Sequence, residues 1–162
     1  MYLSTRGRYA TRAMLELAQH YAEAPLSTAA ISQSQGISER YLQQLLGTLK
    51  RAGLVRVVMG PGGGYTLAGP PTGIRLSAIL DAVEGRLALV ECVRKQSYCP
   101  RAPECLSRGV WLEASELLNR YYSSLTLADV LMKCRKGNLK RWGARPPEIL
   151  PSPRRRRPRK TK

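Results

Sequence analysis

Residues 27–51, STAAISQSQGISERYLQQLLGTLKR, contain two short helical patterns separated by a glycine. Ser27 can cap the first helix and Gly36 can end it, while Ser38 can cap a second helix that stops before Gly53. In the second helix apolar residues recur every three or four positions, which predicts one buried face. Two short helices joined by a glycine-containing turn are typical of a helix-turn-helix, whose second helix enters the major groove of DNA.

The residues that follow the second helix predict a β-hairpin. Residues 54–58 (LVRVV) are typical of a strand, residues 60–64 (GPGGG) of a tight turn, and residues 65–67 (YTL) of the returning strand. A phosphate loop of a nucleotide-hydrolysing protein would require Gly-Lys-Ser/Thr at the start of a helix, whereas here a strand without lysine follows. Glycines let the backbone turn tightly and approach a phosphate closely, so we interpret the hairpin as the wing of a winged helix.

Helical periodicity also appears on both sides of this unit. A first helix, apolar from position 10 to position 21, can be capped by Ser4 or Thr5 and ended by Pro25. Residues 76–84 predict a short amphipathic helix, and residues 110–125 repeat apolar side chains over about four helical turns. The predicted fold is therefore mostly α-helical, a winged helix-turn-helix with one β-hairpin and a long additional helix.

The long helix is too apolar to stand alone on a chain of this size. Its apolar face is either part of the core or the seam of a dimer. We favour a homodimer, because winged-helix regulators usually bind paired half-sites and need two-fold symmetry to do so. Residues 126–129 (TLAD) then have the form of a capping box and predict a terminal helix.

The chain divides into segments with different compositions. Of its 27 Lys and Arg residues, 13 lie in the last thirty positions, together with one of the 11 acidic residues and a run of four arginines. Such a segment buries too little apolar surface to offset the entropy of ordering, so we expect a disordered tail that binds polyanions without sequence preference or merely aids solubility. The predicted divisions are a winged helix-turn-helix at 1–69, a connector with a short helix at 70–91, a cysteine loop at 92–106, a dimerisation helix with a terminal helix at 107–139, and the disordered basic tail at 140–162.

Several classes of protein do not fit this sequence. No run approaches the ~20 apolar residues that cross a bilayer, and the start does not resemble a secretory signal, so we expect a cytoplasmic protein with no membrane partner. No paired acid and base, no nucleophile with a partner histidine and no nucleotide loop are apparent, so we do not expect an enzyme. Four cysteines in such a protein indicate metal binding, redox chemistry or burial rather than structural disulfides.

Six short motifs carry a resemblance to a known family. They are TRGRYA at 5–10, QGIS at 35–38, YLQQL at 41–45, AGLV at 52–55, GPGGGY at 60–65 and LTLAD at 125–129. Over residues 1–132 the chain resembles the IscR/NsrR-type winged-helix transcriptional regulators of bacteria. The resemblance implies a homodimer in which the long helix crosses its partner. It also implies binding to a double-stranded DNA operator that responds to cellular signals.

The resemblance also implies which residues contact DNA. It places the recognition helix at residues 38–51, with Arg40, Gln43 and Gln44 as base readers, since arginine pairs with guanine and glutamine with adenine in the major groove. Iron–sulfur members of the family carry glutamate at the position of Gln43 and arginine at that of Met59, so the operator sequence is expected to differ. The remaining implied DNA contacts are Ser4, Thr5, Arg6, Tyr9, Ser38, Tyr41, Lys50, Arg51, Arg56, Gly62 and Gly63.

Three cysteines form a separate candidate site. Cys92, Cys99 and Cys105 lie within 14 residues, and the charged residues and prolines between them are not core material. The spacing does not match a zinc finger, whereas thiolates suit iron and a loop can wrap around a cluster. The resemblance implies that these cysteines hold an iron–sulfur cluster, more in keeping with 2Fe–2S than 4Fe–4S. Redox-active or idle thiols are the alternative.

The fourth cluster ligand is unassigned. The family places it at positions occupied here by Arg8, Arg12 or Arg108, and arginine cannot coordinate a metal. The sole histidine, His20, is predicted to lie at the surface near the end of the first helix. The open candidates are Glu91, Glu104, Cys134 and an exogenous ligand.

The sequence as a whole predicts a dimeric DNA-binding regulator whose operator affinity depends on a cluster in the cysteine loop. We expect a repressor or a dual regulator. One alternative keeps the fold without a cluster, as a thiol- or partner-dependent repressor. The other is a protein that coats nucleic acid without sequence preference through its basic tail.

Overall fold

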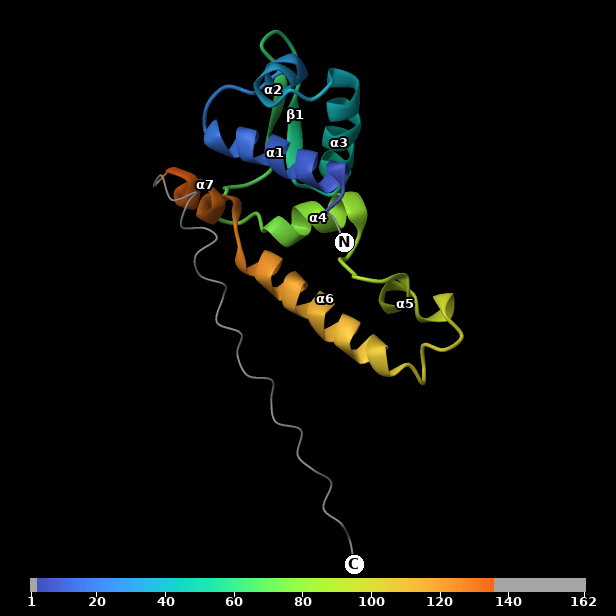
Figure 1. Cartoon of the computed structure of the whole chain (residues 1–162). Coiled ribbons are helices and arrows are strands. Elements are labelled where there is room, and N and C mark those ends of the chain that lie inside the picture. The colour runs from blue at the N-terminus through green and yellow to red at the C-terminus, as the bar shows by residue number, and fades with distance from the viewer. Residues whose placement is uncertain (1–2, 136–162) are drawn as a thin grey trace, which may run out of the picture.

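The computed structural model describes residues 3–135, so the tail predicted at 140–162 lies outside the described residues (Figure 1). The fold is mostly helical with a single two-stranded hairpin, as predicted. Its elements in chain order are α1 (Thr5–Gln19), α2 (Thr28–Gln35), α3 (Glu39–Arg51), β1 (Val55–Val58), β2 (Gly64–Leu67), α4 (Leu76–Glu84), α5 (Glu91–Arg94), the short 3₁₀ helix η1 (Gln96–Tyr98), α6 (Leu106–Ser124) and α7 (Leu127–Arg135).

Helices α2 and α3 form the predicted helix-turn-helix. The Ser27 hydroxyl accepts a hydrogen bond from the Ala30 N–H at 3.1 Å, and Gly36 ends α2 in the left-handed conformation at φ 62°. Ser38 occupies the cap position of α3, but its side chain makes no capping hydrogen bond. The turn between the helices is instead held by Gly36, by the burial of Ile37 and by the Ser32 hydroxyl, which donates to the Ile37 carbonyl at 2.6 Å.

The wing pairs β1 with β2 in an antiparallel hairpin, with Val55 opposite Leu67. It is anchored to the segment before α2, because Leu26 and Tyr65 exchange backbone hydrogen bonds of 3.1 and 2.8 Å. Gly64 is required at this junction, since any Cβ there would collide with the Leu26 carbonyl. The hairpin and the helix-turn-helix thus form one unit.

Helix α1 ends earlier than predicted. We expected it to extend through Tyr21 and to be ended by Pro25, but its last residue is Gln19. A tight turn follows, in which the Glu23 N–H donates to the His20 carbonyl at 3.1 Å and Ala22 takes a positive φ of 71°. This turn leaves Tyr21 exposed instead of placing it on the buried face of the helix.

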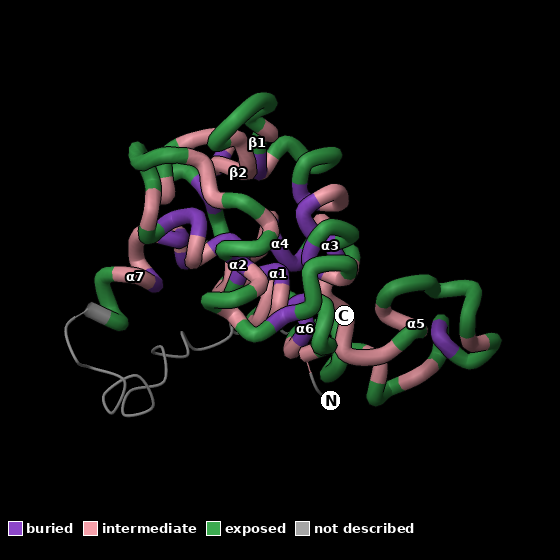
Figure 2. Tube along the Cα trace, turned by 90° about the horizontal axis from the view of Figure 1, so that it is seen from above, coloured by how far each residue is buried: buried purple, intermediate pink, exposed green. Residues whose placement is uncertain are grey.

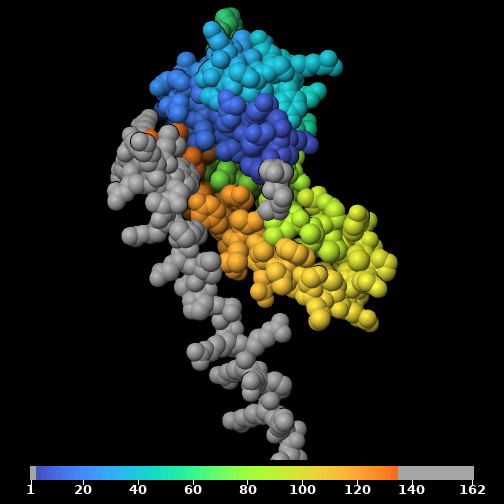
Figure 3. Space-filling view, in the orientation of Figure 1, coloured from blue at the N-terminus to red at the C-terminus, as the bar shows by residue number. Residues whose placement is uncertain are grey.

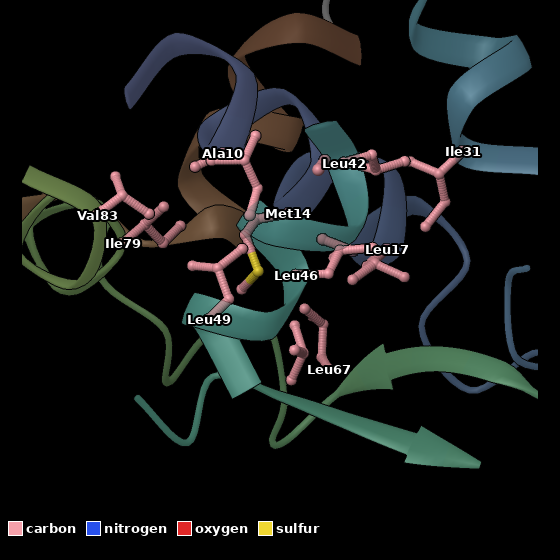
Figure 4. Packing of buried hydrophobic residues seen from close by; sticks show 14 of the residues in the cluster. Ala10, Met14, Leu17, Ile31, Leu42, Leu46, Leu49, Leu67, Ile79 and Val83 are labelled. Atoms are coloured by element: carbon pink, nitrogen blue, oxygen red, sulfur yellow. The ribbon is translucent and has the colours of Figure 1, made fainter. Parts of the chain in front are cut away.

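The core combines segments that are distant in the sequence (Figure 4). Met14 of α1 lies among the leucines of α3 and residues of α4, and the buried cluster extends to Leu127 of α7. Helix α1 lies between the wing and α3 on one side and α4 on the other (Figure 1). The apolar core therefore continues well beyond residue 69.

The capping box of α7 forms as predicted. The Thr126 N–H and hydroxyl both donate to Asp129 Oδ2, at 2.9 and 2.6 Å, and the Thr126 hydroxyl accepts from the Asp129 N–H at 3.1 Å. Backbone hydrogen bonds from Leu76 to Leu125 and from Leu127 to Ile74 join this corner to the start of α4. These contacts position α7 against the core.

The cysteine segment is not the plain loop that we expected. It contains α5, in which Cys92 lies, and η1, and α6 begins directly after Cys105. Figure 2 shows this segment extending away from the rest of the molecule, with little buried surface. A helix of four residues has no detectable periodicity, which is why the sequence did not predict α5. Within residues 3–135, no helix has the length and apolar character needed to span a membrane.

Candidate DNA interface and cysteine segment

Helix α3 has one buried and one exposed face. Leu42, Leu45, Leu46 and Leu49 are buried, whereas Arg40, Gln43 and Gln44 are exposed. Residues three and four positions apart share a face of a helix, so the leucine pattern itself places the three predicted base readers on the opposite side. Figure 3 shows α3 at the surface beside the N-terminal part of α1.

Two tyrosines predicted to contact DNA pack against each other. The rings of Tyr9 on α1 and Tyr41 on α3 meet edge to face, with centroids 6.0 Å apart. The Arg12 guanidinium lies 5.6 Å from the centroid of the Tyr9 ring. Both tyrosines are half-buried, so they brace α1 against α3 in addition to any contact with DNA.

A polar network at the end of α2 was not foreseen from the sequence. Arg12 donates to the Gln35 side chain at 3.0 Å and also to the Gln35 carbonyl, and Gln35 in turn donates to Glu16 at 2.7 Å. The Ser34 hydroxyl donates to the other oxygen of Glu16, also at 2.7 Å. The network holds the last turn of α2 on α1 immediately before the turn into α3. The only signal in the sequence was the pair of opposite charges at Arg12 and Glu16, four residues apart on one helix.

The start of α1 contains a second contact that the sequence did not predict. Ser4 caps the helix by accepting from the Gly7 N–H at 3.2 Å, and its hydroxyl donates to Glu84 Oε1 at 2.7 Å. Thr5 accepts a hydrogen bond from the Arg8 guanidinium at 3.1 Å. Two of the predicted DNA contacts therefore already have partners within the chain.

The wing separates into structural glycines and exposed side chains. Gly62 has a φ of 74°, and a Cβ on Gly63 would collide with the Val58 carbonyl, so both glycines are needed to close the turn. Arg56 is exposed on β1, and Met59 at the tip is 86% exposed. The cations of this region thus come from α1, from the C-terminal turn of α3 (Lys50 and Arg51) and from β1.

The predicted cluster ligands are not assembled into one site. Cys92, Cys99 and Cys105 are free and half-buried, and Cys134 is free and exposed on α7. In the part of the chain that the structure describes, no three His, Cys, Asp or Glu side chains are grouped so that they could hold a metal ion. The thiols suit iron chemically, but the described arrangement does not fit a cluster, and their role as ligands stays a prediction.

The cysteine segment is attached to α6 by specific contacts. The Arg108 guanidinium donates to the Cys92 carbonyl at 3.2 Å, which fastens α5 to the first turns of α6. The Cys105 thiol lies 3.2 Å from the Ser107 hydroxyl. This hydrogen bond, helped by the Arg108 backbone, lowers the pKa of the Cys105 thiol.

Of the candidates for a fourth ligand, Glu91 already has a partner within the chain. Glu91 pairs with Arg94 at 3.5 Å, and His20 lies directly after α1, where its Nδ1 is 2.7 Å from Glu23 Oε2. Arg8, Arg12 and Arg108 each donate hydrogen bonds within the chain.

Helix α6 carries several exposed apolar side chains. Leu106, Val110 and Leu117 are 95%, 60% and 44% exposed, and Ser115 is the only buried residue of the helix. Val110, Ala114, Leu117 and Tyr121 follow one another at intervals of four, three and four residues, so they form one stripe. Ser115 lies about 100° around the helix from Ala114, so the buried side of α6 adjoins this stripe.

Comparisons with known proteins agree with this architecture. Residues 3–133 match the family described as "Rrf2: Iron-dependent Transcriptional regulator". The rrf2 protein of Nitratidesulfovibrio vulgaris is 40% identical over 131 residues, which cover 81% of this chain and 87% of the relative.

Two solved structures are similar over most of the chain. IscR of T. potens is 34% identical with a TM-score of 0.71, and the match covers 86% of this chain and 92% of that chain. CymR (YrzC), the global cysteine regulator of B. subtilis, is also 34% identical, with a TM-score of 0.67 and coverage of 80% and 95%. The family match spans the winged helix, the cysteine segment and α6, and on this basis the chain belongs to the Rrf2 family of transcriptional regulators.

Proposed function

We propose that this Rrf2-family regulator is a homodimeric repressor that recognises a double-stranded DNA operator through α3. The observation that carries the proposal is the solvent face of α3, where Arg40, Gln43 and Gln44 are exposed opposite the buried leucines. Arginine reads guanine and glutamine reads adenine through paired hydrogen bonds in the major groove. The operator would then contain both base types in each half-site.

The backbone contacts would surround this reading face. Arg6 on α1, Lys50 and Arg51 at the end of α3, and Arg56 on the wing are exposed cations that would neutralise phosphates. The remaining proposed contacts are polar or glycine residues on the same elements: Ser4, Thr5, Tyr9, Ser38, Tyr41, Gly62 and Gly63.

The second protomer would pack on α6. The stripe of Val110, Ala114, Leu117 and Tyr121 has the alternating spacing of a helix that packs along another helix. An exposed apolar face of this kind is costly to leave in water. A two-fold axis at α6 would give the complex two copies of α3, one for each half-site.

The proposal for DNA reading is tested by selecting duplexes from a random-sequence pool with the wild-type protein. Gln43→Ala should lose about 1–3 kcal/mol of discrimination at one base pair of each half-site, as measured by competition binding. Gln96→Ala, an equally exposed glutamine in η1, is the matched control and should leave selectivity unchanged. Enrichment of no sequence, or equal behaviour of the two variants, would contradict the proposal.

We further propose that the iron-loaded protein holds an iron–sulfur cluster, of the 2Fe–2S type, on Cys92, Cys99 and Cys105. Three half-buried thiols within 14 residues and the iron-dependent character of the family support this assignment. Thiolates are the ligands of such clusters. The segment that contains α5 and η1 would have to rearrange for the three thiols to converge.

A second candidate is a thiol-dependent regulator without a cluster. Two observations favour it, namely the absence of a grouped ligand set within residues 3–135 and the similarity to a global cysteine regulator. In that case reversible oxidation or ligation of a thiol would change the operator affinity.

Iron and acid-labile sulfide analysis after anaerobic purification separates the two candidates. A cluster gives matching iron and sulfide that are lost in Cys92→Ala, Cys99→Ala and Cys105→Ala and retained in the control Ser97→Ala, an exposed residue of the same segment. A colourless, iron-free protein after reconstitution, whose operator binding is nevertheless abolished by alkylation of one of the three thiols, would establish the second candidate.

A further inference from the structure

Glu84, the last residue of α4, lies at the start of α1. Its Oε1 accepts a hydrogen bond of 2.7 Å from the Ser4 hydroxyl, the group that also caps α1. Gly7 makes room for this carboxylate, because a Cβ at that position would collide with Glu84 Oε1 and would lie 3.2 Å from the Leu80 side chain. The missing side chain of Gly7 and the Ser4 hydroxyl thus both accommodate the carboxylate at this end of the helix.

The position is one where a negative charge matters. The first turn of a helix presents unpaired N–H groups and the positive end of the helix dipole. Helix α1 has no acidic residue in its own first turn, so α4 supplies the carboxylate. In the described part of the chain no salt bridge neutralises Glu84. The same helix end, with Ser4, Thr5 and Arg6, is where the proposed function places a DNA phosphate.

A carboxylate and a phosphate compete for this site. The Ser4 hydroxyl has one proton, so it can donate to Glu84 or to a phosphate oxygen but not to both. The two anions also repel each other at the helix end, and added salt weakens this repulsion because the contact with Ser4 is exposed. Binding of a phosphate at the start of α1 therefore requires the Glu84 carboxylate to move away.

Residues 85–90 join Glu84 to the cysteine segment, and we call this stretch of chain the tether. Gly85 ends α4 with a φ of 79°, and the next residues are held by α6, where Asn119 donates to the Leu87 carbonyl at 2.9 Å. The Leu89 N–H donates to the Ser115 hydroxyl at 3.0 Å. Because α5 follows at residue 91, we expect a displacement of the cysteine segment or of α6 to be transmitted to the end of α4.

We propose that Glu84 is a gating residue that opposes DNA binding by occupying the start of α1. When the tether holds the end of α4 against the start of α1, the Glu84 carboxylate keeps its hydrogen bond from the Ser4 hydroxyl and repels the DNA phosphates. When the tether shifts, the carboxylate withdraws and the helix end becomes available. The inference rests on the proposed function, since it names how the DNA-binding surface is regulated.

The test compares Glu84→Gln with the matched control Asp81→Asn in the full-length protein. Both changes remove one negative charge from α4, but Asp81 is exposed and lies one turn away from the contact with Ser4. Glu84→Gln should tighten binding to the selected duplex about two- to fivefold at low salt while lowering the melting temperature of the free protein. Asp81→Asn should change neither quantity appreciably.

A second variant tests the tether. Asn119→Ala removes the hydrogen bond to Leu87 and should also tighten binding in the wild-type background, but it should add nothing to Glu84→Gln. Sedimentation velocity of the wild type and of each variant checks that the oligomeric state is unchanged.

The outcomes separate this inference from the proposed function. If the wild-type protein selects no duplex, the proposed function fails and the gate fails with it. If wild type binds its selected duplex but Glu84→Gln binds no tighter, or Asp81→Asn tightens binding equally, only the gate is overturned. Additive effects of Asn119→Ala and Glu84→Gln would likewise overturn the link through the tether.

Discussion

Single glycines in the wing have different roles, and substitution distinguishes them. Gly64→Ala should lower the free energy of unfolding by about 1–3 kcal/mol, because its Cβ would collide with backbone atoms of Leu26 that cannot move aside without breaking the contact to Tyr65. Gly69→Ala is the control, since nothing lies within 4 Å of a Cβ there. Urea denaturation measures both. Equal stability of the two variants would mean that the wing is not anchored at Leu26.

The capping box of α7 should give a defined pH dependence. Hydrogen bonds from the Thr126 hydroxyl and N–H keep the pKa of Asp129 below its ordinary value. A carboxylate with a lowered pKa stabilises the fold fully above its unfolded pKa of about 3.9, and this contribution is lost as the pH falls through the lowered value.

Asp129→Asn should therefore destabilise the protein at pH 7 and should lose this disadvantage in acid. Thermal unfolding of wild type and variant between pH 7 and about pH 2 measures the difference. In a Thr126→Val background the difference at pH 7 should be smaller, because the hydroxyl no longer donates and only the backbone N–H remains. A difference that is independent of pH would contradict the role assigned to the carboxylate.

Residues of the candidate site were predictable only where local periodicity places them. The exposure of Arg40, Gln43 and Gln44 follows from the leucines of the same helix. The contact between Ser4 and Glu84 joins residues 80 positions apart, and no local pattern signals it. For the same reason the sequence suggested Arg12 only as an excluded metal ligand, although it braces the helix-turn-helix through Gln35.

Among the elements, α6 supports the sharpest prediction. Leu117→Glu places a charge in the middle of the apolar stripe and should convert the proposed dimer to a monomer, with a large loss of operator affinity. Leu112→Glu is the control, because Leu112 is also exposed on α6 but lies off the stripe. Analytical ultracentrifugation measures the oligomeric state. A dimer that survives Leu117→Glu but not Leu112→Glu would place the interface on another face of α6.

The elements themselves differed in how well the sequence predicted them. The periodic segments α3 and α4 and the capping box of α7 were recognised from the sequence, but the capping hydrogen bond expected from Ser38 does not form. The end of α1 was not, because the positive φ of Ala22 ends the helix before Pro25 and alanine carries no signal for such a turn. Helix α5 is too short for a hydrophobic period, so its residues were predicted as loop.

At the scale of the whole molecule, the location of charge predicts how salt will affect binding. A chain that ends at residue 139 lacks much of the basic excess. It should keep its preference for the selected duplex. The negative slope of log K against the logarithm of the salt concentration should become shallower by about 0.9 per lost phosphate contact. Titrations at several salt concentrations measure this slope. Loss of sequence preference in the shortened chain would favour the alternative of a protein that coats nucleic acid.

The core is completed by helices late in the sequence, and this has a consequence for synthesis of the protein on the ribosome. Helix α1 emerges first, but its apolar face is completed by α4 and by Leu127 of α7, more than a hundred residues later. A nascent chain that has released only the helix-turn-helix and the wing still exposes part of α1, and domains fold as units during synthesis. A product truncated before α7 would therefore be a substrate for proteolysis instead of an independent DNA-binding fragment that competes for the operator.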